Sequence, residues 1–172
     1  PFANKQHHVL KAILPMSIQI RRGTPSDIPA AYQLIVDLAI YEKAPNEVKT
    51  TPETMLKDGF GANPLFQFFV AEQNGKVIGI ALYYFAYSTW KGKILYLDDL
   101  VVAETERGNG IGKMLLDQLL QEAKIESCKR IHWQVLDWNE PAIRFYKRLN
   151  TTMDAGWINC KILEDQIELG QF

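Results

Sequence analysis

Three glycines stand at alternate positions in the segment "LVVAETERGNGIGKMLLDQLL" (residues 100–120), between an apolar run and an amphipathic one. The apolar residues Ile111, Leu115 and Leu119 have helical spacing, so a helix is predicted to begin among the glycines. Glycine inside a helix costs about 1 kcal/mol relative to alanine. The N–H groups and the dipole at a helix start attract anions, and glycines let an anion approach the backbone closely. The pattern therefore indicates a site for a phosphate or pyrophosphate group.

The spacing of the glycines distinguishes between kinds of phosphate site. A dinucleotide fingerprint that starts at Gly108 needs a third glycine where Lys113 stands. A P-loop needs a glycine at Arg107 and a serine or threonine at Met114. An Arg-x-x-Gly-x-Gly pattern does fit, and it consists of Arg107, Gly110 and Gly112, with Gly108 as an extra glycine. Arg107 would add positive charge at the entrance. A turn that only packs the helix tightly against a sheet remains the structural alternative.

The elements around this loop alternate in the order β-α-α-β-β-β-α-β-α-β-β, which predicts a mixed α/β domain. A hairpin at 66–88 is the clearest feature, because Asn74-Gly75 supplies the positive φ angles of a two-residue turn. Thr50 and Asn139 are the predicted caps of two short helices. The other strands are predicted at 17–24, 93–103, 130–136, 156–163 and 165–169, and the helices at 24–39, 50–60, 111–123 and 139–149.

Composition limits the class of protein. The chain has 172 residues and a net charge of −1, so it predicts one domain at 16–172 without a general attraction to nucleic acid. We expect residues 1–15 to be an N-terminal extension, of the kind that cloning can add. The longest apolar run, 77–87, is too short for a membrane span. Cys128 and Cys160 form neither a disulfide framework nor a zinc-type spacing, so a cytoplasmic setting and no metal are expected.

Two segments resemble the GNAT superfamily of acetyl-CoA-dependent N-acetyltransferases: "YLDDLVVAETERGNGIGKMLL" and "VLDWNEPAIRFYKRL". The strings "WNEPAI-FYKR" and "YYF-YSTWKGK" narrow the resemblance to the diamine acetyltransferases, of the spermidine/spermine and thialysine types. The likeness extends from about residue 18 to about residue 162. It implies a twisted mixed sheet of about six to seven strands with about four helices. Two parallel strands in it, at 95–103 and 130–136, would splay apart to form the acetyl-CoA cleft.

The resemblance also implies the residues that hold acetyl-CoA. The backbone of Leu100, Val101 and Val102 would bind the pantetheine arm as an added strand does. Asn139 and Ala142 would contact the cofactor from the other side. The pyrophosphate would lie on the loop and the helix start, at Arg107, Gly108, Asn109, Gly110, Ile111, Gly112 and Lys113.

Two catalytic roles follow from the same resemblance. A primary amine with a pKa of about 10.4 is mostly protonated at neutral pH, so a base must remove a proton before the amine attacks the thioester. Asp98, acting directly or through water, is the candidate base, although the family usually has Glu there. Asp98 and Asp99 are adjacent on a strand, so their side chains are expected to face opposite ways. Tyr146 is the candidate acid that protonates the departing thiolate.

The acceptor is expected to be a small amine. Tyr41, Glu42, Trp90 and Asp98 match the amine site of the family. Ser88 replaces an acidic residue common in polyamine-acetylating members, which favours a thialysine-like or lysine-like acceptor. A protein-lysine or N-terminal acetyltransferase and a non-catalytic acyl-CoA sensor are the alternatives. The family commonly forms homodimers through its C-terminal strands, and the same is expected here.

Overall fold

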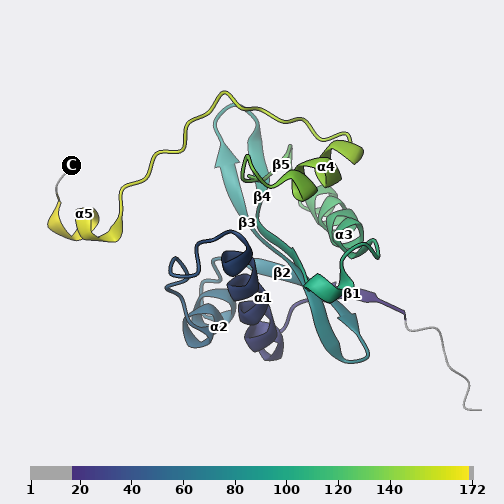
Figure 1. Ribbon diagram of the computed structural model, residues 1–172. Helices are drawn as coiled ribbons and strands as arrows, with labels where there is room; N and C mark the ends of the chain where they lie inside the picture. Colours follow the sequence, from purple (N-terminus) through teal and green to yellow (C-terminus); the bar gives the residue numbers. More distant parts are fainter. Residues whose placement is uncertain (1–16, 171–172) are drawn as a thin grey trace, which may run out of the picture. The chain divides into compact units, whose positions relative to one another are not determined.

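The computed structural model describes residues 17–170, which form a five-stranded sheet and five α-helices. The strands lie in chain order, and all neighbours are antiparallel except the parallel pair β4 and β5 (Figure 1). The strands are β1 (Gln19–Arg22), β2 (Gln67–Gln73), β3 (Lys76–Ser88), β4 (Gly92–Val102) and β5 (Ile131–His132). The described chain divides after Gln134 into two compact units.

The first unit contains three helices that flank the sheet, and the second contains two. The helices are α1 (Ile28–Tyr41), α2 (Pro52–Phe60), α3 (Ile111–Ile125), α4 (Glu140–Arg148) and α5 (Glu164–Leu169), with single 3-10 turns at Pro25–Asp27 and Glu104–Glu106. Thr51 caps α2 by accepting the N–H of Thr54, so the predicted cap at Thr50 is wrong by one residue. Asn139 caps α4 as predicted, with its Oδ1 accepting the N–H of Ala142 at 3.3 Å.

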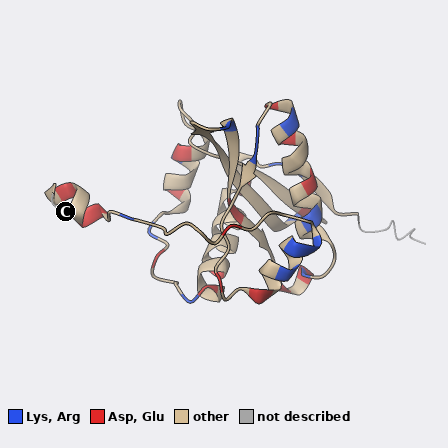
Figure 2. Ribbon diagram, turned by 90° about the horizontal axis from the view of Figure 1, so that it is seen from above, with Lys and Arg blue, Asp and Glu red and all other residues tan. Residues whose placement is uncertain are grey.

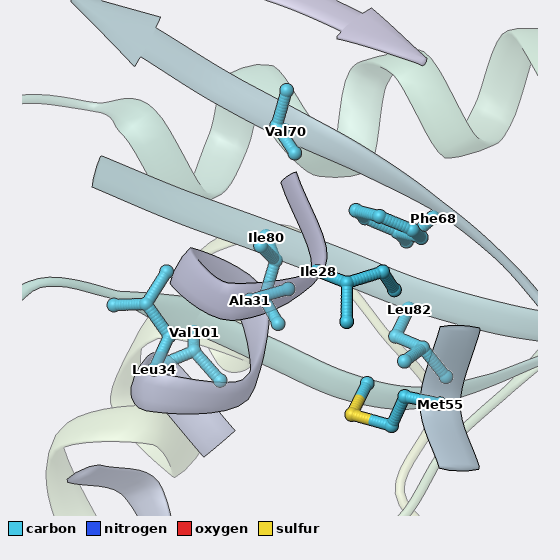
Figure 3. Packing of buried hydrophobic residues seen from close by; sticks show 9 residues of the cluster. All are labelled: Ile28, Ala31, Leu34, Met55, Phe68, Val70, Ile80, Leu82 and Val101. Carbon is cyan, nitrogen blue, oxygen red and sulfur yellow. The ribbon is translucent and has the colours of Figure 1, made fainter. Parts of the chain in front are cut away.

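One face of the sheet carries α1 and α2, and the other carries α3 (Figure 1). Figure 3 shows the apolar cluster on the α1 face, where side chains from the two helices meet those of β2, β3 and β4. The apolar residues recur every three or four positions on the helices and every second position on the strands, so each element has one apolar face. Burial of these faces against each other holds α1 on the sheet. The cluster consists of Ile28, Ala31, Leu34, Met55, Phe68, Val70, Ile80, Leu82 and Val101.

On the opposite face, α3 lies close to the backbone of the sheet. A Cβ on Gly79 of β3 would stand 3.4 Å from side-chain atoms of both Ile111 and Leu115. Ile111, Leu115 and Leu119 are almost completely buried, which confirms the apolar face read from the sequence. The N-terminus of α3 is therefore fixed against β3 and β4, directly after the glycine loop.

The C-terminal region differs from the prediction. β5 has two residues instead of seven, and among residues 135–170 the structure contains no strand. The segment 156–163, predicted to be a strand, has no regular structure, and 165–169 lies within helix α5. The sheet thus has five strands in the described chain, not six or seven. The predicted extension at 1–15 lies outside the described residues.

The strands carry Arg21, Arg22, Glu72, Lys76, Lys93, Asp98 and Asp99, and most of the other charged residues lie on helices and loops (Figure 2). Acidic and basic side chains are interspersed there, in agreement with the net charge of −1. Within residues 17–170, no helix has the length and apolar character to cross a membrane.

Candidate active site

The glycine loop joins the end of β4 to the start of α3. Gly108 and Gly110 have φ angles of 85° and 78°, in the left-handed region that side chains disfavour. A Cβ on either glycine would meet no atom within 4 Å, so the space above the loop is open. Gly110 is the N-cap of α3 and provides no side-chain cap, and the first helical hydrogen bond runs from Met114 N–H to Gly110 C=O. The preceding N–H groups of α3 therefore face an accessible space, as an anion site requires.

Arg107 connects this loop to helix α1. Its Nε donates a hydrogen bond to the carbonyl oxygen of Val102 at 3.2 Å. Its guanidinium lies over the ring of Tyr41, with the central carbon 5.2 Å from the ring centroid. A cation over an aromatic face at this distance is attracted to it. The positive charge at the loop entrance is thus held beside the C-terminal end of α1, where Glu42 is the C-cap.

One edge of β4 lacks a strand partner where the pantetheine arm is expected. β5 pairs with β4 only at Leu95 and Tyr96, after which β4 continues to Val102 with β3 on its other side. In residues 17–170 no strand covers the β5-side edge beyond Tyr96. The backbone of Leu100, Val101 and Val102 thus lies on an edge open to a further extended chain.

A β-bulge in β4 changes the positions of the two aspartates. Leu97 pairs with Tyr83 and Asp99 pairs with Leu82, so Asp98 is an extra residue opposite β3. Asp99 shares the α1 face with Val101, two residues further along the strand. The charge of Asp98 contributes to raising the pKa of Tyr96, the residue two positions before it, which places it near that ring. The bulge therefore breaks the expected alternation, and both aspartates face the α1 side of the sheet.

The pKa values of Asp98, Asp99 and Glu42 are all raised above the usual values of these carboxyls. Burial raises the pKa of Asp99 to about 7, with further contributions from the negative charges of Asp98 and Glu42. Burial also raises the pKa of Asp98 and of Glu42. Asp99 can therefore exchange protons near neutral pH, and its ionised form is favoured by a neighbouring cation. Asp99 was not among the predicted site residues, because its role depends on a bulge that the sequence does not reveal.

Three predicted site residues belong to the second unit. Asn139 holds the N-terminus of α4, and Ala142 lies in its first turn. Tyr146 lies in the last turn, where its ring centroid is 5.2 Å from that of Phe145. The backbone carbonyl of Tyr146 accepts a hydrogen bond from the hydroxyl of Thr151 at 3.1 Å. Asn139 thus has a structural role as a helix cap, and Tyr146 has one in its contact with Phe145. The roles expected for them in cofactor binding and catalysis are additional to these.

Trp90 lies apart from the acidic residues. It occupies the turn between β3 and β4 and is 83% exposed. From Gly92 to Asp98 the strand extends by about 20 Å, at about 3.3 Å per residue. Ser88, at the same turn, accepts the N–H of Lys91 on its hydroxyl oxygen at 3.2 Å. The first unit thus joins Tyr41, Glu42, Asp98 and Arg107 at one end of β4 and leaves Trp90 at the other.

Comparison with known proteins identifies the family. The acetyltransferase (GNAT) family matches residues 32–150, more than half of the chain. The thialysine N-epsilon-acetyltransferase of Mus musculus is 38% identical over 154 residues, which cover 83% of this chain and 91% of the mouse protein. The spermidine/spermine N(1)-acetyltransferase-like protein 1 of Homo sapiens is 38% identical over 149 residues, which cover 81% of this chain and 21% of the human protein.

Solved structures show the same fold at lower sequence identity. An integron cassette protein from the mobile metagenome of V. cholerae aligns with a TM-score of 0.74 and 21% identity, over 90% of this chain and 97% of that chain. An aminoglycoside N-acetyltransferase in complex with CoA aligns with a TM-score of 0.71 and 16% identity, over 87% of this chain and 99% of that chain. GNAT enzymes use acetyl-CoA, and the open glycine loop at the start of α3 suits its pyrophosphate. The chain belongs to the GNAT family and is an N-acetyltransferase.

Proposed function

We propose that this enzyme transfers an acetyl group from acetyl-CoA directly to a primary amine of a small diamine, polyamine or lysine-like amino acid. The observation that carries the proposal is the group of three carboxyls made by Asp98 and Asp99 of β4 and by Glu42 at the C-terminal end of α1. The contact of Arg107 with Tyr41 joins this group to the glycine loop. A cationic acceptor would thus be held near the thioester of acetyl-CoA.

Acetyl-CoA would be held mainly by backbone groups. The pyrophosphate would accept hydrogen bonds from the N–H groups at the start of α3, and Arg107 would add a charge-assisted bond. The pantetheine arm would pair with the open edge of β4 at Leu100, Val101 and Val102. Asn139 and Ala142 would contact the cofactor from α4, as the family resemblance implies.

The reaction removes two protons from the acceptor nitrogen and gives one to the leaving sulfur. The acceptor arrives as an ammonium ion, and Asp98 removes one proton, directly or through a water molecule. The free amine attacks the thioester carbon, a C–N bond forms, and the C–S bond breaks. The backbone N–H of Leu100 or Val101 stabilises the negative charge that develops on the carbonyl oxygen. Tyr146 gives its proton to the departing thiolate, and the attacking nitrogen passes the second proton that it loses to the resulting tyrosinate.

Asp99 is the alternative base. Its pKa of about 7 suits proton exchange at neutral pH better than an ordinary carboxyl does. Asp98, the more exposed of the two, has the easier access to an acceptor. In either case the other carboxylates of the group attract the ammonium ion.

Several relatives are named for small amino-acid acceptors. Thialysine N-epsilon-acetyltransferases from several animals are about a third or more identical to this chain. An L-ornithine N5-acetyltransferase of Arabidopsis thaliana is 23% identical. Ser88 leaves the turn after β3 without the acidic residue that would favour a longer polyamine. We therefore expect a thialysine-like or lysine-like amino acid to be preferred over spermidine.

The decisive experiment measures CoA release from acetyl-CoA with spermidine, spermine, putrescine, thialysine, lysine and a lysine-containing peptide. We expect turnover with the small amino acids to exceed that with the polyamines. Turnover with the peptide alone would instead establish the protein-lysine alternative. Binding of acetyl-CoA without turnover of any amine would favour a sensor.

We further propose that the enzyme is a homodimer. Several large apolar side chains of the second unit are exposed, and exposed apolar surface of this kind marks protein contacts. They are Trp157, Ile158, Ile162, Leu163, Ile167 and Leu169. Sedimentation at micromolar concentration is expected to give twice the mass of one chain. A species of 19.7 kDa would contradict the proposal.

A further inference from the structure

A surface pocket of about 210 Å³ lies at the C-terminal end of α3, beside the start of β5. Its lining combines an apolar floor with three cationic side chains and contains no carboxylate. The lining residues are Leu120, Ala123, Lys124, Cys128, Lys129, Arg130 and Ile131. This pocket has no part in the chemistry proposed above.

The three cations have no ion-pair partner in the part of the chain that the structure describes. None of the salt bridges among residues 17–170 includes Lys124, Lys129 or Arg130. The nearby carboxylates are engaged elsewhere, because Glu126 pairs with Lys93 and Glu122 pairs with Arg22. None of the three cations is therefore neutralised by a direct ion pair with another described residue.

The end of α3 does not need these cations as caps. The carbonyls of Ala123, Glu122 and Lys124 already accept backbone N–H groups from Cys128, Glu126 and Ser127, at 2.8, 2.9 and 3.1 Å. A basic residue near a helix end often serves to satisfy such carbonyls, and that explanation is weak here.

The backbone that carries two of the cations is held by the sheet. Lys129 donates its N–H to the carbonyl of Lys93 at 2.8 Å, and the carbonyl of Arg130 accepts the N–H of Leu95 at 3.0 Å. The conformational entropy lost when a ligand binds would thus come from the side chains and not from the backbone. An arginine with two lysines is a combination that binds phosphate well.

We propose that this pocket binds a small phosphomonoester, with the phosphate on Lys124, Lys129 and Arg130 and the organic part on Leu120, Ala123 and Ile131. A phosphomonoester is largely a dianion at neutral pH, which suits a cluster of three cations. The site is separate from the glycine loop, because the helix between them, 15 residues long, measures about 22 Å at about 1.5 Å per residue. The ligand is therefore distinct from the pyrophosphate of acetyl-CoA.

The Cys128 thiol lines the same pocket but is not the reactive group. Burial raises its pKa, and the charges of Glu126 and Glu122 raise it further against the opposing effect of Lys93. A thiol in this state is a poor nucleophile, so the ligand would bind without a covalent bond.

Amide chemical shifts of isotope-labelled protein, titrated with phenyl phosphate at neutral pH, test the proposal. We expect shifts at the amides of Ala123, Lys124, Lys129, Arg130 and Ile131, both with and without saturating CoA. Inorganic phosphate should bind several-fold more weakly, because it cannot use the apolar floor. Equal affinity for the two probes would overturn the proposal of an organic ligand.

Two matched double variants test whether phenyl phosphate binds in this pocket or is attracted only by the overall charge of the protein. The double variant Lys124→Gln/Arg130→Gln should lose about tenfold or more in affinity for phenyl phosphate. The control Lys49→Gln/Lys57→Gln removes two exposed lysines outside the pocket and should keep the affinity. Equal losses in both variants, or shifts confined to residues 108–113, would overturn the proposal. Both double variants should retain acetyl transfer, so failure of this site and failure of the proposed enzyme function can be distinguished.

Discussion

Asp99 gives the molecule a carboxyl that remains partly protonated at neutral pH. Its pKa of about 7 in the folded protein exceeds the usual value of 3.8, because burial and the charges of Asp98 and Glu42 oppose ionisation. The unfolded chain releases this proton at lower pH, so the folded state loses stability as pH rises from about 4 to about 7.

Asp99→Asn is therefore expected to stabilise the protein at about pH 8 and to change little at about pH 4. The gain should be on the order of 1–2 kcal/mol, since a pKa unit corresponds to about 1.4 kcal/mol and Asp99 keeps some contact with solvent. Urea unfolding at both pH values measures it, and Asp37→Asn, which changes an exposed aspartate, is the control. The same stability change at both pH values would contradict the raised pKa.

The pH dependence of turnover distinguishes the two candidate bases. If Asp99 accepts the proton, the rise in turnover through about pH 7 should disappear in Asp99→Asn and persist in Asp98→Asn. If Asp98 is the base, the reverse is expected, with a larger fall in kcat for Asp98→Asn.

Tyr146 has both a structural and a chemical interpretation, and removal of one oxygen separates them. Tyr146→Phe keeps the ring that contacts Phe145 and removes the proton donor. We expect kcat to fall by about 100-fold or more, with little change in the affinity for acetyl-CoA and in Tm. Phe145→Leu is a control that alters the packing and retains the hydroxyl. If Tyr146→Phe turned over at the original rate, Tyr146 would not be the acid, and its role would be limited to packing.

The glycine loop shows how an element can lose stability in order to bind a ligand. Gly110→Ala puts a Cβ on a residue with φ of 78° and should cost about 1–2 kcal/mol in the free energy of unfolding. Gly75→Ala is a matched control, because Gly75 has φ of 75° and equally open space but lies in the β2–β3 turn. Both variants should lose similar stability in urea, and only Gly110→Ala should raise KM for acetyl-CoA. A similar KM in both variants would contradict the pyrophosphate site.

Elements with local signals were predicted well, and those that depend on distant partners were not. The Asn74-Gly75 turn and the apolar face of α3 are encoded by nearby residues, and both were confirmed. The segment 156–163 has apolar residues typical of a strand, but a strand needs a neighbour to accept its hydrogen bonds, and no described strand pairs with it. Asp99 was missed for a related reason, since a bulge depends on the pairing of β4 with β3.

At the scale of the whole first unit, two adjacent arginines on β1 link both helical layers to the sheet. Arg21 faces α1 and pairs with Asp27 at 2.7 Å and Glu72 at 2.6 Å. The side chain of Arg21 holds the pKa of Asp27 down at about 2, so this pair persists in moderate acid and is lost only as pH falls towards 2. Arg22 faces the other layer, since adjacent residues of a strand point to opposite faces.

Arg22 joins the first strand to α3, 100 residues away in the sequence. Both carboxylate oxygens of Glu122 lie 2.9 Å from the Arg22 guanidinium, and the hydroxyl of Tyr83 donates to Glu122 at 3.1 Å. The two partners differ in burial, because the side chain of Glu122 is 7% exposed and that of Arg22 is 52% exposed. Removing Arg22 would therefore leave a buried carboxylate without its cation, whereas removing Glu122 would leave an exposed guanidinium.

Arg22→Met is expected to cost more stability than Glu122→Gln. The first change leaves a buried carboxylate with a hydroxyl as its main partner, and should cost about 2–4 kcal/mol. The second leaves a guanidinium that water can reach, and should cost about 1–2 kcal/mol. In the double variant no buried charge remains, so its loss should be smaller than the sum of the single losses. Urea unfolding of the four proteins measures the difference, and additive losses would mean that this pair does not link β1 to α3 energetically.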